Sequence, residues 1–424
     1  MMLSNTALKE MILITALVVA MLLLISIMGS AYGVRVLVEA SCYAIIALGL
    51  TIQWGYAGLF NAGIMGFVAL GGFSAMLMTF PTNPRFWETD LPGELGGAFL
   101  KLIIGVLLVV AASQLHRLKV PRKIQIPFTM ILGAVVYFWV INGFAPVTSA
   151  IVSEAGFIGG FGLPIWVGWT VGGILAGTVA YFIGHICLGL RSDYLAIATL
   201  GVAEIIKAFL KNFEWMTRGT LTVSPLPWPV PGAGEVGFIM ARALYLSVTA
   251  VMIAVIFFLL HRAYNGPWGR MMRAIRDNEI SSSAMGKDVN KRRLEVFIFG
   301  CVLMGIGGAA LATFNGIFDP NGYLPLNHTF LIWVMVILGG PGNNIGTLFG
   351  AVLVYVVWVM SEPAALALLN AISYLGDLWF AWEAPSDFSS RALQARVFSI
   401  GLIITLVLRY APKGLFPEKI AQYK

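Results

Sequence analysis

Residues 242–260 read RALYLSVTAVMIAVIFFLL, an apolar run in which Arg242 is the only charged residue. A helix of about 20 apolar residues crosses the roughly 30 Å core of a bilayer, so this run is long enough to span a membrane. Residues 269–293 then read GRMMRAIRDNEISSSAMGKDVNKRR, which is polar and basic, and residues 294–314 are apolar again. Apolar runs of this length, joined by short basic stretches, predict an all-α, polytopic integral membrane protein.

The composition of the whole chain supports this fold class. Of its 424 residues, 59% are hydrophobic and 11% are charged, whereas an average soluble protein carries about 25% charged residues. This is too little charge to cover the surface of a soluble enzyme of this size. The net charge of +7 does not indicate nucleic-acid binding, because the basic residues stand in short blocks between apolar runs, as orientation signals do.

About twelve apolar segments are bounded by charged residues or by glycine and proline. They are residues 11–28, 33–53, 55–80, 95–115, 124–145, 164–190, 194–209, 242–260, 294–314, 330–338, 345–360 and 395–410. The first is long for the apolar region of a signal peptide, so we expect a retained membrane helix. The tenth is too short to span alone and is separated from the eleventh by Gly339-Gly340-Pro341-Gly342, so these two segments predict a re-entrant pair.

Lysine and arginine in the short connections predict the orientation of the chain. If all twelve segments cross, the basic clusters fall on one side; they are residues 117–123, Arg191, residues 262–293 and residues 409–419. The connections on the other side are richer in acidic residues, such as Glu88 and Asp90. We therefore expect a multi-pass protein in membrane lipid, with both termini in the cytoplasm.

The largest polar stretch on the basic side, residues 266–293, has the pattern of two short helices. The first has an apolar edge around Met272. Asp277 or Asn278 can cap the second helix, and Gly286 is suited to its end. We expect these helices to lie along the membrane surface and present both charge signs to a partner; the alternative is a solvated basic loop held by anionic lipid.

Five stretches of the chain resemble those of one transporter family and occur in the same order. They are Gly55-Tyr-Ala-Gly58 with the glycine-rich residues 63–72, Asp193-Tyr-Leu-Ala-Ile-Ala-Thr-Leu200, Arg273-Ala-Ile-Arg-Asp-Asn-Glu279, Leu338-Gly-Gly-Pro-Gly342 and Arg409-Tyr-Ala-Pro-Lys-Gly-Leu415. The third resembles the coupling loop of branched-chain amino acid ABC transporter permeases of the LivM type. The resemblance covers residues 33–80 and about 164–410.

This resemblance implies that residues 1–424 form a single transmembrane permease domain, with the coupling loop at residues 266–293. The chain departs from the family in two places. Residues 81–163 form an insertion with two extra helices, and Ile64 stands where many members have a histidine.

The implied function is that of a membrane-spanning subunit of an ABC importer, which translocates branched-chain or other apolar amino acids across the bacterial cell inner membrane. Its implied partners are a second permease subunit, two ATP-binding subunits and a periplasmic solute-binding protein. ATP is then expected on the partner subunits, with no cofactor in this chain, and the sequence indeed contains no GxxxxGK[ST] phosphate loop.

Two sets of residues are candidates for this function. The residues expected to couple the chain to the ATPases are Arg273, Arg276, Asp277, Glu279 and Gly286. Polar residues inside or beside the apolar segments are candidates for the substrate path, because an ionisable residue there costs about 2.5–3.5 kcal/mol on insertion scales. These candidates are Asn61, Glu204, Asn343 and Asn344.

Each substrate-path candidate has a structural alternative. Glu204 can pair with Lys207, three residues further along a short, broken segment. Asn61 and the pair Asn343-Asn344 lie beside glycine-rich interruptions, where exposed backbone dipoles can meet a zwitterionic amino acid. The alternative for these asparagines is tight helix packing through glycine.

Two further groups lie toward the outer side. Arg35 and Glu39 are one helical turn apart, so we expect them to pair with each other. Two outer connections contain Trp215, Trp228, Trp379 and Trp382, which we expect to anchor a docked binding protein or to belong to the aromatic belt of the bilayer edge.

Other functions stay open on the sequence. A similar permease for urea or short-chain amides is the nearest alternative, and a stand-alone secondary transporter is the alternative of another class. Against the latter, no ladder of Asp, Glu and His follows the apolar segments. The four histidines are scattered without the spacing of metal ligands, and no nucleophile is paired with a base, so we expect neither a metal site nor an enzyme.

Overall fold

The computed structural model describes residues 5–115, 121–380 and 394–418, without the side chains of residues 5–9 and 376–380. In this part of the chain the regular structure is helical, and β-structure is limited to two isolated bridges, between Thr82 and Gly159 and between Val223 and Phe318. Eight of the helices described are long and apolar enough to cross a membrane. The prediction of an all-α, polytopic membrane protein is confirmed at this level.

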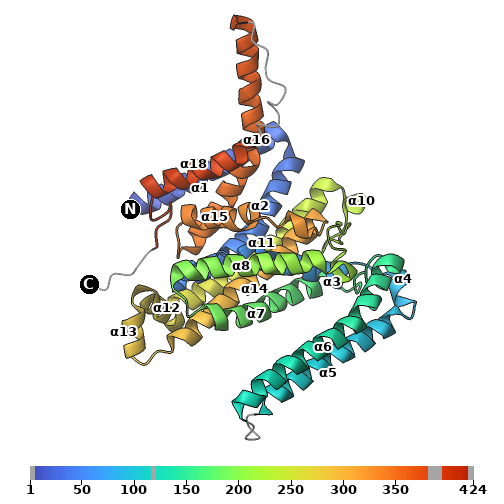
Figure 1. The fold of residues 1–424 in the computed structure, drawn as a ribbon. Coiled ribbons are helices and arrows are strands. Elements are labelled where there is room, and N and C mark those ends of the chain that lie inside the picture. Colours follow the sequence, from blue (N-terminus) through green and yellow to red (C-terminus); the bar gives the residue numbers. More distant parts are fainter. Residues whose placement is uncertain (1–4, 116–120, 381–393, 419–424) are drawn as a thin grey trace.

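The helices follow one another as Figure 1 shows. Before the large polar loop they are α1 (Asn5–Met28), α2 (Ser30–Leu50), α3 (Ile64–Thr79), α4 (Pro84–Trp87), α5 (Leu91–Ser113), α6 (Arg122–Ala150), α7 (Ile165–Cys187), α8 (Ser192–Asn212), α9 (Glu214–Thr217), α10 (Ala233–Val236) and α11 (Phe238–Asn265). From the loop onward they are α12 (Pro267–Asp277), α13 (Glu279–Ala284), α14 (Val289–Asn315), α15 (Leu331–Gly339), α16 (Asn344–Phe380) and α18 (Ala395–Tyr410).

Short segments of other helical type adjoin several of these helices. π-Helical turns continue α2 over Thr51–Tyr56 and α6 over Ile151–Ala155, and another precedes α15 at Leu326–Phe330. A 3-10 turn, Pro320–Gly322, lies in the connection after α14.

Helix α14 forms the centre of the bundle, where it packs against α2, α3 and α7. Glycine allows this packing to be very close: a Cβ atom on Gly71 would lie 1.9 Å from the Gly305 carbonyl oxygen, and one on Gly308 would lie 2.3 Å from the Val68 carbonyl oxygen. Membrane helices associate through such small residues, because lipid provides no hydrophobic driving force between helices.

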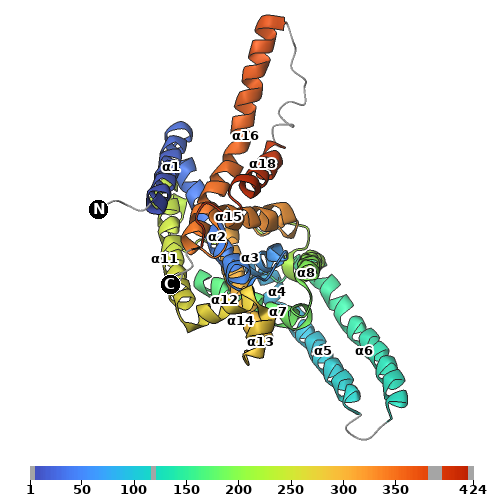
Figure 2. The same ribbon diagram turned by 90° about the vertical axis from the view of Figure 1, so that its left-hand side faces the viewer.

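Helices α5 and α6 pack against each other as a hairpin that extends away from the bundle (Figures 1 and 2). Where the hairpin joins the rest of the chain, Phe86, Leu91, Ile151 and Trp215 form a separate apolar cluster. Trp215 is only 8% exposed. The prediction that Trp215 is a surface anchor is therefore wrong, because its ring packs inside this cluster.

Trp228, another predicted anchor, packs partly within the chain. Its ring stacks on Phe314 with the centroids 5.5 Å apart, and it meets the edge of the fully buried Tyr245. Because Trp228 is still partly exposed, its role as an anchor stays a prediction. Trp382 and the side chain of Trp379 lie outside the described residues.

Each of the twelve predicted apolar segments overlaps a helix, but several boundaries differ. The helix formed by α2 and its π-helical turn ends at Tyr56 and α3 begins at Ile64, so residues 55–80 do not form one span. Helix α8, predicted as a short and broken segment, is one helix of 21 residues. The tenth segment belongs to an apolar helix, Leu326–Gly339. The number of twelve crossings and the re-entrant pair stay predictions.

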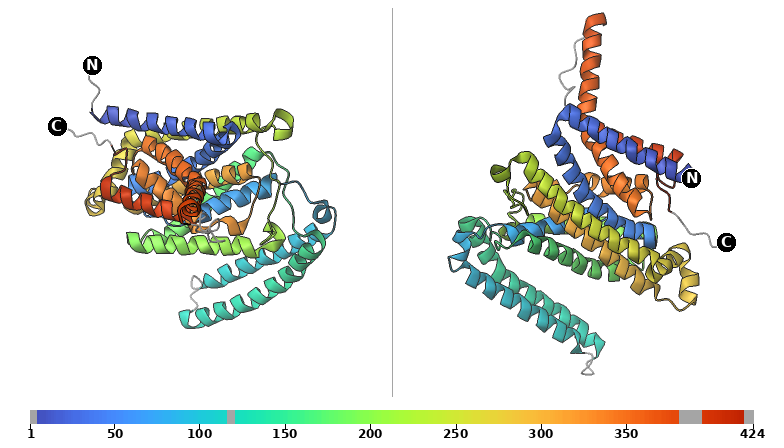
Figure 3. Two further views of the ribbon diagram at one scale, coloured as in Figure 1. Left: turned by 90° about the horizontal axis from the view of Figure 1, so that it is seen from above. Right: turned by 180° about the vertical axis from the view of Figure 1, so that it is seen from behind.

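The bundle has two ends that matter for function. Figure 1 places α12, α13 and the first turn of α1 at one end and α4 and α10 at the other, and the rear view in Figure 3 agrees. We call these ends the loop face and the opposite face. The helix break after Tyr56 and the start of α16 both lie near the loop face, because Gly55 contacts Gly342 and residues of α12.

Candidate functional site

Residues 266–288 form the two short helices that the sequence predicted. Pro267 is the first residue of α12, where a missing N–H group is harmless. Asn278 caps α13, with its Oδ1 accepting a hydrogen bond from the Ser281 amide at 2.9 Å. Gly286 follows with φ +78°, a conformation that suits glycine after a helix end. The apolar edge of α12 is buried at Met272 and Ile275.

The predicted coupling residues divide into an inward and an outward group. Arg273 and Arg276 are partly buried, and the Arg273 guanidinium lies 4.5 Å from the centroid of the Tyr264 ring. The exposed group consists of Asp277, Glu279 and Gly286. Glu279 also pairs with Arg293 at 2.8 Å, which joins the start of α13 to the start of α14.

Helix α13 also exposes apolar side chains. Ile280 is 83% exposed and Met285 is 78% exposed. They lie between charged residues on the same exposed turn, Glu279 on one side and Lys287 on the other. An apolar edge rimmed by charges is typical of a surface that binds another protein.

Arg276 connects α12 to the interior of the bundle. Its Nη1 donates a hydrogen bond to the Gly55 carbonyl oxygen and forms an ion pair of 3.0 Å with Glu418 Oε2. The Tyr264 hydroxyl donates to the other carboxylate oxygen of Glu418. Burial raises the pKa of Glu418 to about 7. The name loop junction is used below for the group formed by Gly55, Tyr264, Arg276, Gly342 and Glu418.

Two helix interruptions meet at the loop junction. A Cβ atom on Gly55 would lie 2.4 Å from the Gly342 backbone nitrogen, so the end of the α2 helix and the turn before α16 touch through their backbones. The next residue, Tyr56, donates a hydrogen bond of 2.6 Å to Asn344 Oδ1. A displacement of α12 must therefore act on both interruptions at once.

The predicted Asn343-Asn344 pair lies at the start of α16. Asn343 Oδ1 accepts hydrogen bonds from the Ile345 and Gly346 amides at 3.0 and 3.2 Å. Both asparagines line a cavity of about 180 Å³ together with Tyr264 and Glu418 of the loop junction. Asn343 thus caps the beginning of α16, whereas Asn344 joins this helix to Tyr56.

The other two substrate-path candidates are placed differently. Asn61 is fully buried: its Nδ2 donates to Gln53 Oε1 at 2.9 Å and its Oδ1 accepts from the Gly63 amide at 2.8 Å. These contacts fit the packing alternative. Glu204 is exposed on α8, and no ion pair joins it to Lys207.

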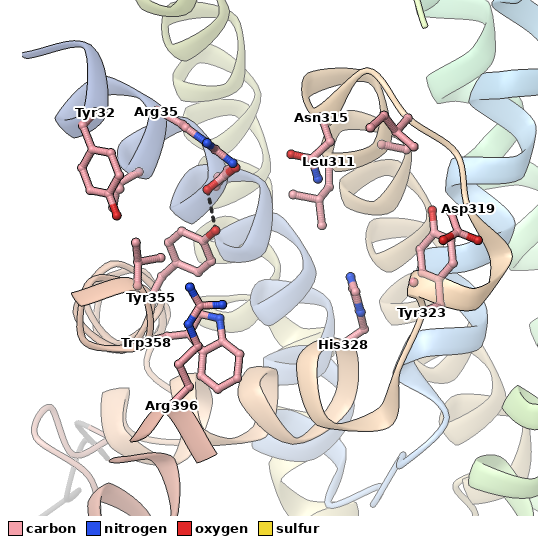
Figure 4. Close-up of a pocket in the computed structure, with 16 residues that line it drawn as sticks. Tyr32, Arg35, Leu311, Asn315, Asp319, Tyr323, His328, Tyr355, Trp358 and Arg396 are labelled. Atoms are coloured by element: carbon pink, nitrogen blue, oxygen red, sulfur yellow. Dashed lines mark hydrogen bonds and ion pairs between the residues drawn. The ribbon is translucent and has the colours of Figure 1, made fainter. Parts of the chain in front are cut away.

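A second feature, which the sequence did not predict as a site, is a cavity of about 550 Å³ (Figure 4). It is lined by the beginning of α2 and the end of α14, which are the ends of these helices away from the loop face. Its wall combines residues of α2, α14, α16 and α18 with the connection after α14. The predicted pair is present in this wall, with Arg35 Nε 3.1 Å from Glu39 Oε1. The Tyr355 hydroxyl donates to the other oxygen of Glu39 at 2.5 Å.

The remaining polar wall of the cavity comes from distant parts of the chain. Arg396, at the start of α18, pairs with Glu362 and lies 5.8 Å from the Trp358 ring centroid. His328 lies across from them, with its ring 5.2 Å from that of Tyr323. The cavity therefore presents both charge signs between aromatic side chains.

Neither region resembles a metal centre. Among the residues that the structure describes, no three His, Cys, Asp or Glu side chains gather to hold a metal ion. The cysteines Cys42, Cys187 and Cys301 are buried and unpaired.

Apolar helices around a cavity of mixed charge, and helix interruptions attached to a surface loop, are features of an integral membrane protein with a polar interior. Comparison with known proteins gives the family. The model of the family described as branched-chain amino acid transport system / permease component matches residues 32–115 and 126–378. The chain belongs to this family, and its members are transport permease components rather than enzymes.

The similar curated proteins carry LivM and LivH names. The high-affinity branched-chain amino acid transport system permease protein LivM of Escherichia coli K12 is 25% identical over 284 residues, which cover 62% of this chain and 60% of that protein. The probable LivM permease of Methanocaldococcus jannaschii is 29% identical over 251 residues, covering 58% and 67%. LivH of Salmonella typhimurium is 24% identical over 220 residues, covering 51% and 67%.

The matches cover only part of the relatives and continue through most of the predicted insertion. The chain matches about three fifths of the length of the Escherichia coli relative, and no solved structure matches it significantly. The family match continues through most of residues 81–163 and skips only residues 116–125 in that region. The predicted insertion therefore stays a prediction.

Proposed function

We propose that the chain is a membrane-spanning permease subunit of an ABC importer for branched-chain or other apolar amino acids. A second permease subunit, two ATP-binding subunits and a periplasmic solute-binding protein complete the importer. The observation that carries this proposal is the family match over most of the chain, together with relatives whose names specify branched-chain amino acid transport.

The sequence supports a division of labour between this chain and its partners. It contains no GxxxxGK[ST] phosphate loop, which is the usual site for the phosphates of ATP in transport ATPases. Hydrolysis therefore takes place on separate subunits, and this chain receives their movement.

The loop of α12 and α13 is the proposed receiver. The contact with an ATPase is formed by Ile280, Met285 and the exposed Asp277 and Glu279. Gly286 allows the chain to turn sharply at the end of this surface. Arg276 passes the movement to the bundle, because it binds both the Gly55 carbonyl and Glu418. Arg273 holds α12 against Tyr264 at the end of α11.

The proposed topology has twelve crossings and a cytoplasmic loop face. Both the first turn of α1 and the last described residues, near Glu418, lie at the loop face. The basic residues of the loop support a cytoplasmic position for this end. The chain then lies in the bacterial inner membrane with both termini inside, and the cavity of Figure 4 faces the periplasm.

Reconstitution tests the proposal. The chain is placed in proteoliposomes with the permease, ATPase and binding-protein products of its neighbouring genes, and uptake of radiolabelled leucine is measured with ATP or a non-hydrolysable analogue. Leucine uptake that requires hydrolysis is expected. Uptake of urea in place of leucine would support the amide alternative, and leucine transport by the chain alone would make it a secondary transporter.

A further inference from the structure

The cavity of Figure 4 contains two buried nitrogen atoms that have no hydrogen-bond partner. In the part of the chain that the structure describes, three buried side-chain nitrogens lack a partner: Arg293 Nε, His328 Nδ1 and Arg396 Nε. The last two both belong to residues that line this one cavity. A buried polar group without a partner destabilises the protein, so a cavity that collects two of them is suited to a ligand that satisfies both.

The position of these residues suggests the polar groups of that ligand. Arg396 offers an N–H donor, which needs an acceptor such as a carboxylate oxygen. Figure 4 shows His328 between the wall of Arg396 and Trp358 and the wall of Tyr323 and Asp319. Asp319 Oδ1 accepts a hydrogen bond of 2.8 Å from the Asn321 amide, but Asp319 forms no ion pair with any described residue, so its negative charge is available to a cation.

The other charged pair in the cavity is already satisfied. Glu39 uses both carboxylate oxygens, one for Arg35 and one for the Tyr355 hydroxyl. Arg35 uses its Nε for this pair, and its side chain is 52% exposed. Arg396 pairs with Glu362, but its Nε has no partner. The cavity thus presents a free N–H donor on one side of His328 and a carboxylate without an ion pair on the other, which matches a molecule that carries both charges.

The rest of the wall is apolar or aromatic. Leu311, Val36 and Val359 line the cavity beside Trp358 and Tyr323. Its volume of about 550 Å³ is within the usual range for small-molecule sites, which combine apolar walls with a few placed polar groups. A zwitterion with an apolar side chain fits this combination, whereas an uncharged amide can hydrogen-bond to these groups but brings no positive charge to Asp319.

We propose that this cavity is a binding site for the transported amino acid within the permease itself. Arg396 Nε and His328 Nδ1 bind its carboxylate, and Asp319 binds its ammonium group. This inference rests on the proposed function, because it takes the solute of the importer as the ligand. It adds that the permease, and not only a binding protein, recognises the zwitterion.

Equilibrium binding tests this site directly. The assembled transporter is purified in lipid nanodiscs without binding protein, and ¹⁴C-leucine binding is measured by scintillation proximity. Saturable binding is expected. Unlabelled leucinamide, which lacks the carboxylate, and 4-methylpentanoate, which lacks the ammonium group, are each expected to compete at least tenfold more weakly than leucine. Equal competition by all three compounds would overturn the zwitterion site.

Variants locate the binding. Arg396→Lys keeps the charge beside Glu362 but removes Nε, and His328→Phe removes the ring nitrogens; each is expected to raise the Kd for leucine at least tenfold. His328→Gln, which keeps a hydrogen-bonding group, is expected to stay within threefold of the wild type. The matched controls are Arg85→Lys and His185→Phe, at exposed positions outside the cavity, and they are expected to bind as the wild type does.

The two proposals fail separately. An assembled transporter without ATP-driven leucine uptake contradicts the proposed function. Normal uptake without saturable leucine binding to the permease, or with unchanged binding in both cavity variants, contradicts the binding site alone. The competition by leucine analogues uses the wild-type protein, so it decides the question even where a variant fails to assemble.

Discussion

Glu279 has both a local partner and an exposed surface. Its ion pair with Arg293 is 2.8 Å long and its side chain is 47% exposed. We predict that Glu279→Lys lowers ATP-driven uptake at least about tenfold. The proposed ATPase surface matches a carboxylate at this position, so a lysine there would make a like-charge contact, which costs several kcal/mol at an interface. The measurement is uptake together with ATP hydrolysis in proteoliposomes, where hydrolysis is expected to lose its stimulation by substrate.

A charge swap separates coupling from local stability. Glu279→Arg combined with Arg293→Glu restores an ion pair within the loop but leaves the reversed charge on the partner surface. An exposed pair of this kind is worth only about 0.2–1 kcal/mol. The swap is therefore expected to transport as poorly as Glu279→Lys; recovery of uptake would assign Glu279 to the loop's own stability.

Glu418 gives the loop junction a pH dependence. Burial raises the pKa of Glu418 from its ordinary value of 4.5 to about 7, although Arg276 lies 3.0 Å away. Because the folded protein holds the proton more tightly than the unfolded chain, this residue's contribution to stability is complete below about pH 4.5 and is lost as pH rises to about 7.

Melting curves between pH 4 and pH 8 in detergent test whether the contribution of Glu418 to stability is lost as pH rises. We predict that the Tm of the wild type falls relative to that of Glu418→Gln between about pH 4.5 and about pH 7, and that the difference is constant above this interval. Glu362→Gln is the control, because Glu362 also pairs with an arginine but lies outside the loop junction. A constant difference over the whole range would contradict the raised pKa of Glu418.

At the scale of elements, the contact between the two helix interruptions is the most sensitive feature. A methyl group on Gly55 would lie 2.4 Å from the Gly342 nitrogen, so Gly55→Ala must push the end of the α2 helix away from the turn before α16. Overpacking of this kind costs about 1–3 kcal/mol. We predict lower thermal stability and uncoupled ATP hydrolysis, measured in the same proteoliposomes.

Gly201→Ala is the matched control for Gly55→Ala. Gly201 lies on α8, and a methyl group added there would have no neighbouring atom within 4 Å, so alanine meets open space. Its effect on stability and coupling is expected to be small. Similar losses in both variants would show that the contact between the interruptions has no special role.

The helices themselves were largely predictable because hydropathy is a local property. Each predicted apolar segment overlaps a helix, and the cap at Asn278 and the end at Gly286 follow from side-chain chemistry near each residue. The predicted ends of the segments were wrong where polar residues continue a helix. Helix α16 runs through Pro363, which membrane helices tolerate because neighbouring groups satisfy the freed carbonyl.

The sites were less predictable because they join residues that are far apart in the chain. The sequence identified Arg276 and the Arg35–Glu39 pair, whose partners or patterns are nearby. It gave no signal for Glu418, which meets Arg276 from the far end of the chain, or for Arg396 facing the cavity that His328 lines. Tertiary packing alone brings these groups together. Asn61, predicted for the substrate path, instead lies in a polar network around Gln53.

For the whole molecule, the arrangement of the loop and the cavity agrees with a transport cycle driven from one side. The loop junction ties α12 to two helix interruptions at the loop face, and the cavity is lined by the ends of α2 and α14 away from that face. Helix α2 belongs to both regions, since Glu39 lines the cavity and Gly55, in the π-helical turn that continues α2, lies in the junction. Movement of the loop can therefore change the cavity through one continuous helix.

This account requires the loop face to be cytoplasmic, and labelling of single cysteines tests that requirement. The native cysteines are buried, so they give little background with a membrane-impermeant maleimide. Ser283→Cys lies on the exposed side of α13 and Thr89→Cys is exposed after α4, at the opposite face. In intact spheroplasts we predict labelling of Thr89→Cys alone, with Ser283→Cys labelled only after permeabilisation.

The two cysteines control for each other, because both sites are exposed polar positions at the ends of short helices. Denaturing the membranes before labelling gives the full signal for each. Labelling of Ser283→Cys in intact spheroplasts would place α12 and α13 on the periplasmic side, where no ATP-hydrolysing subunit reaches them. The loop junction would then have to respond to a solute-binding protein, and the direction of coupling would be reversed.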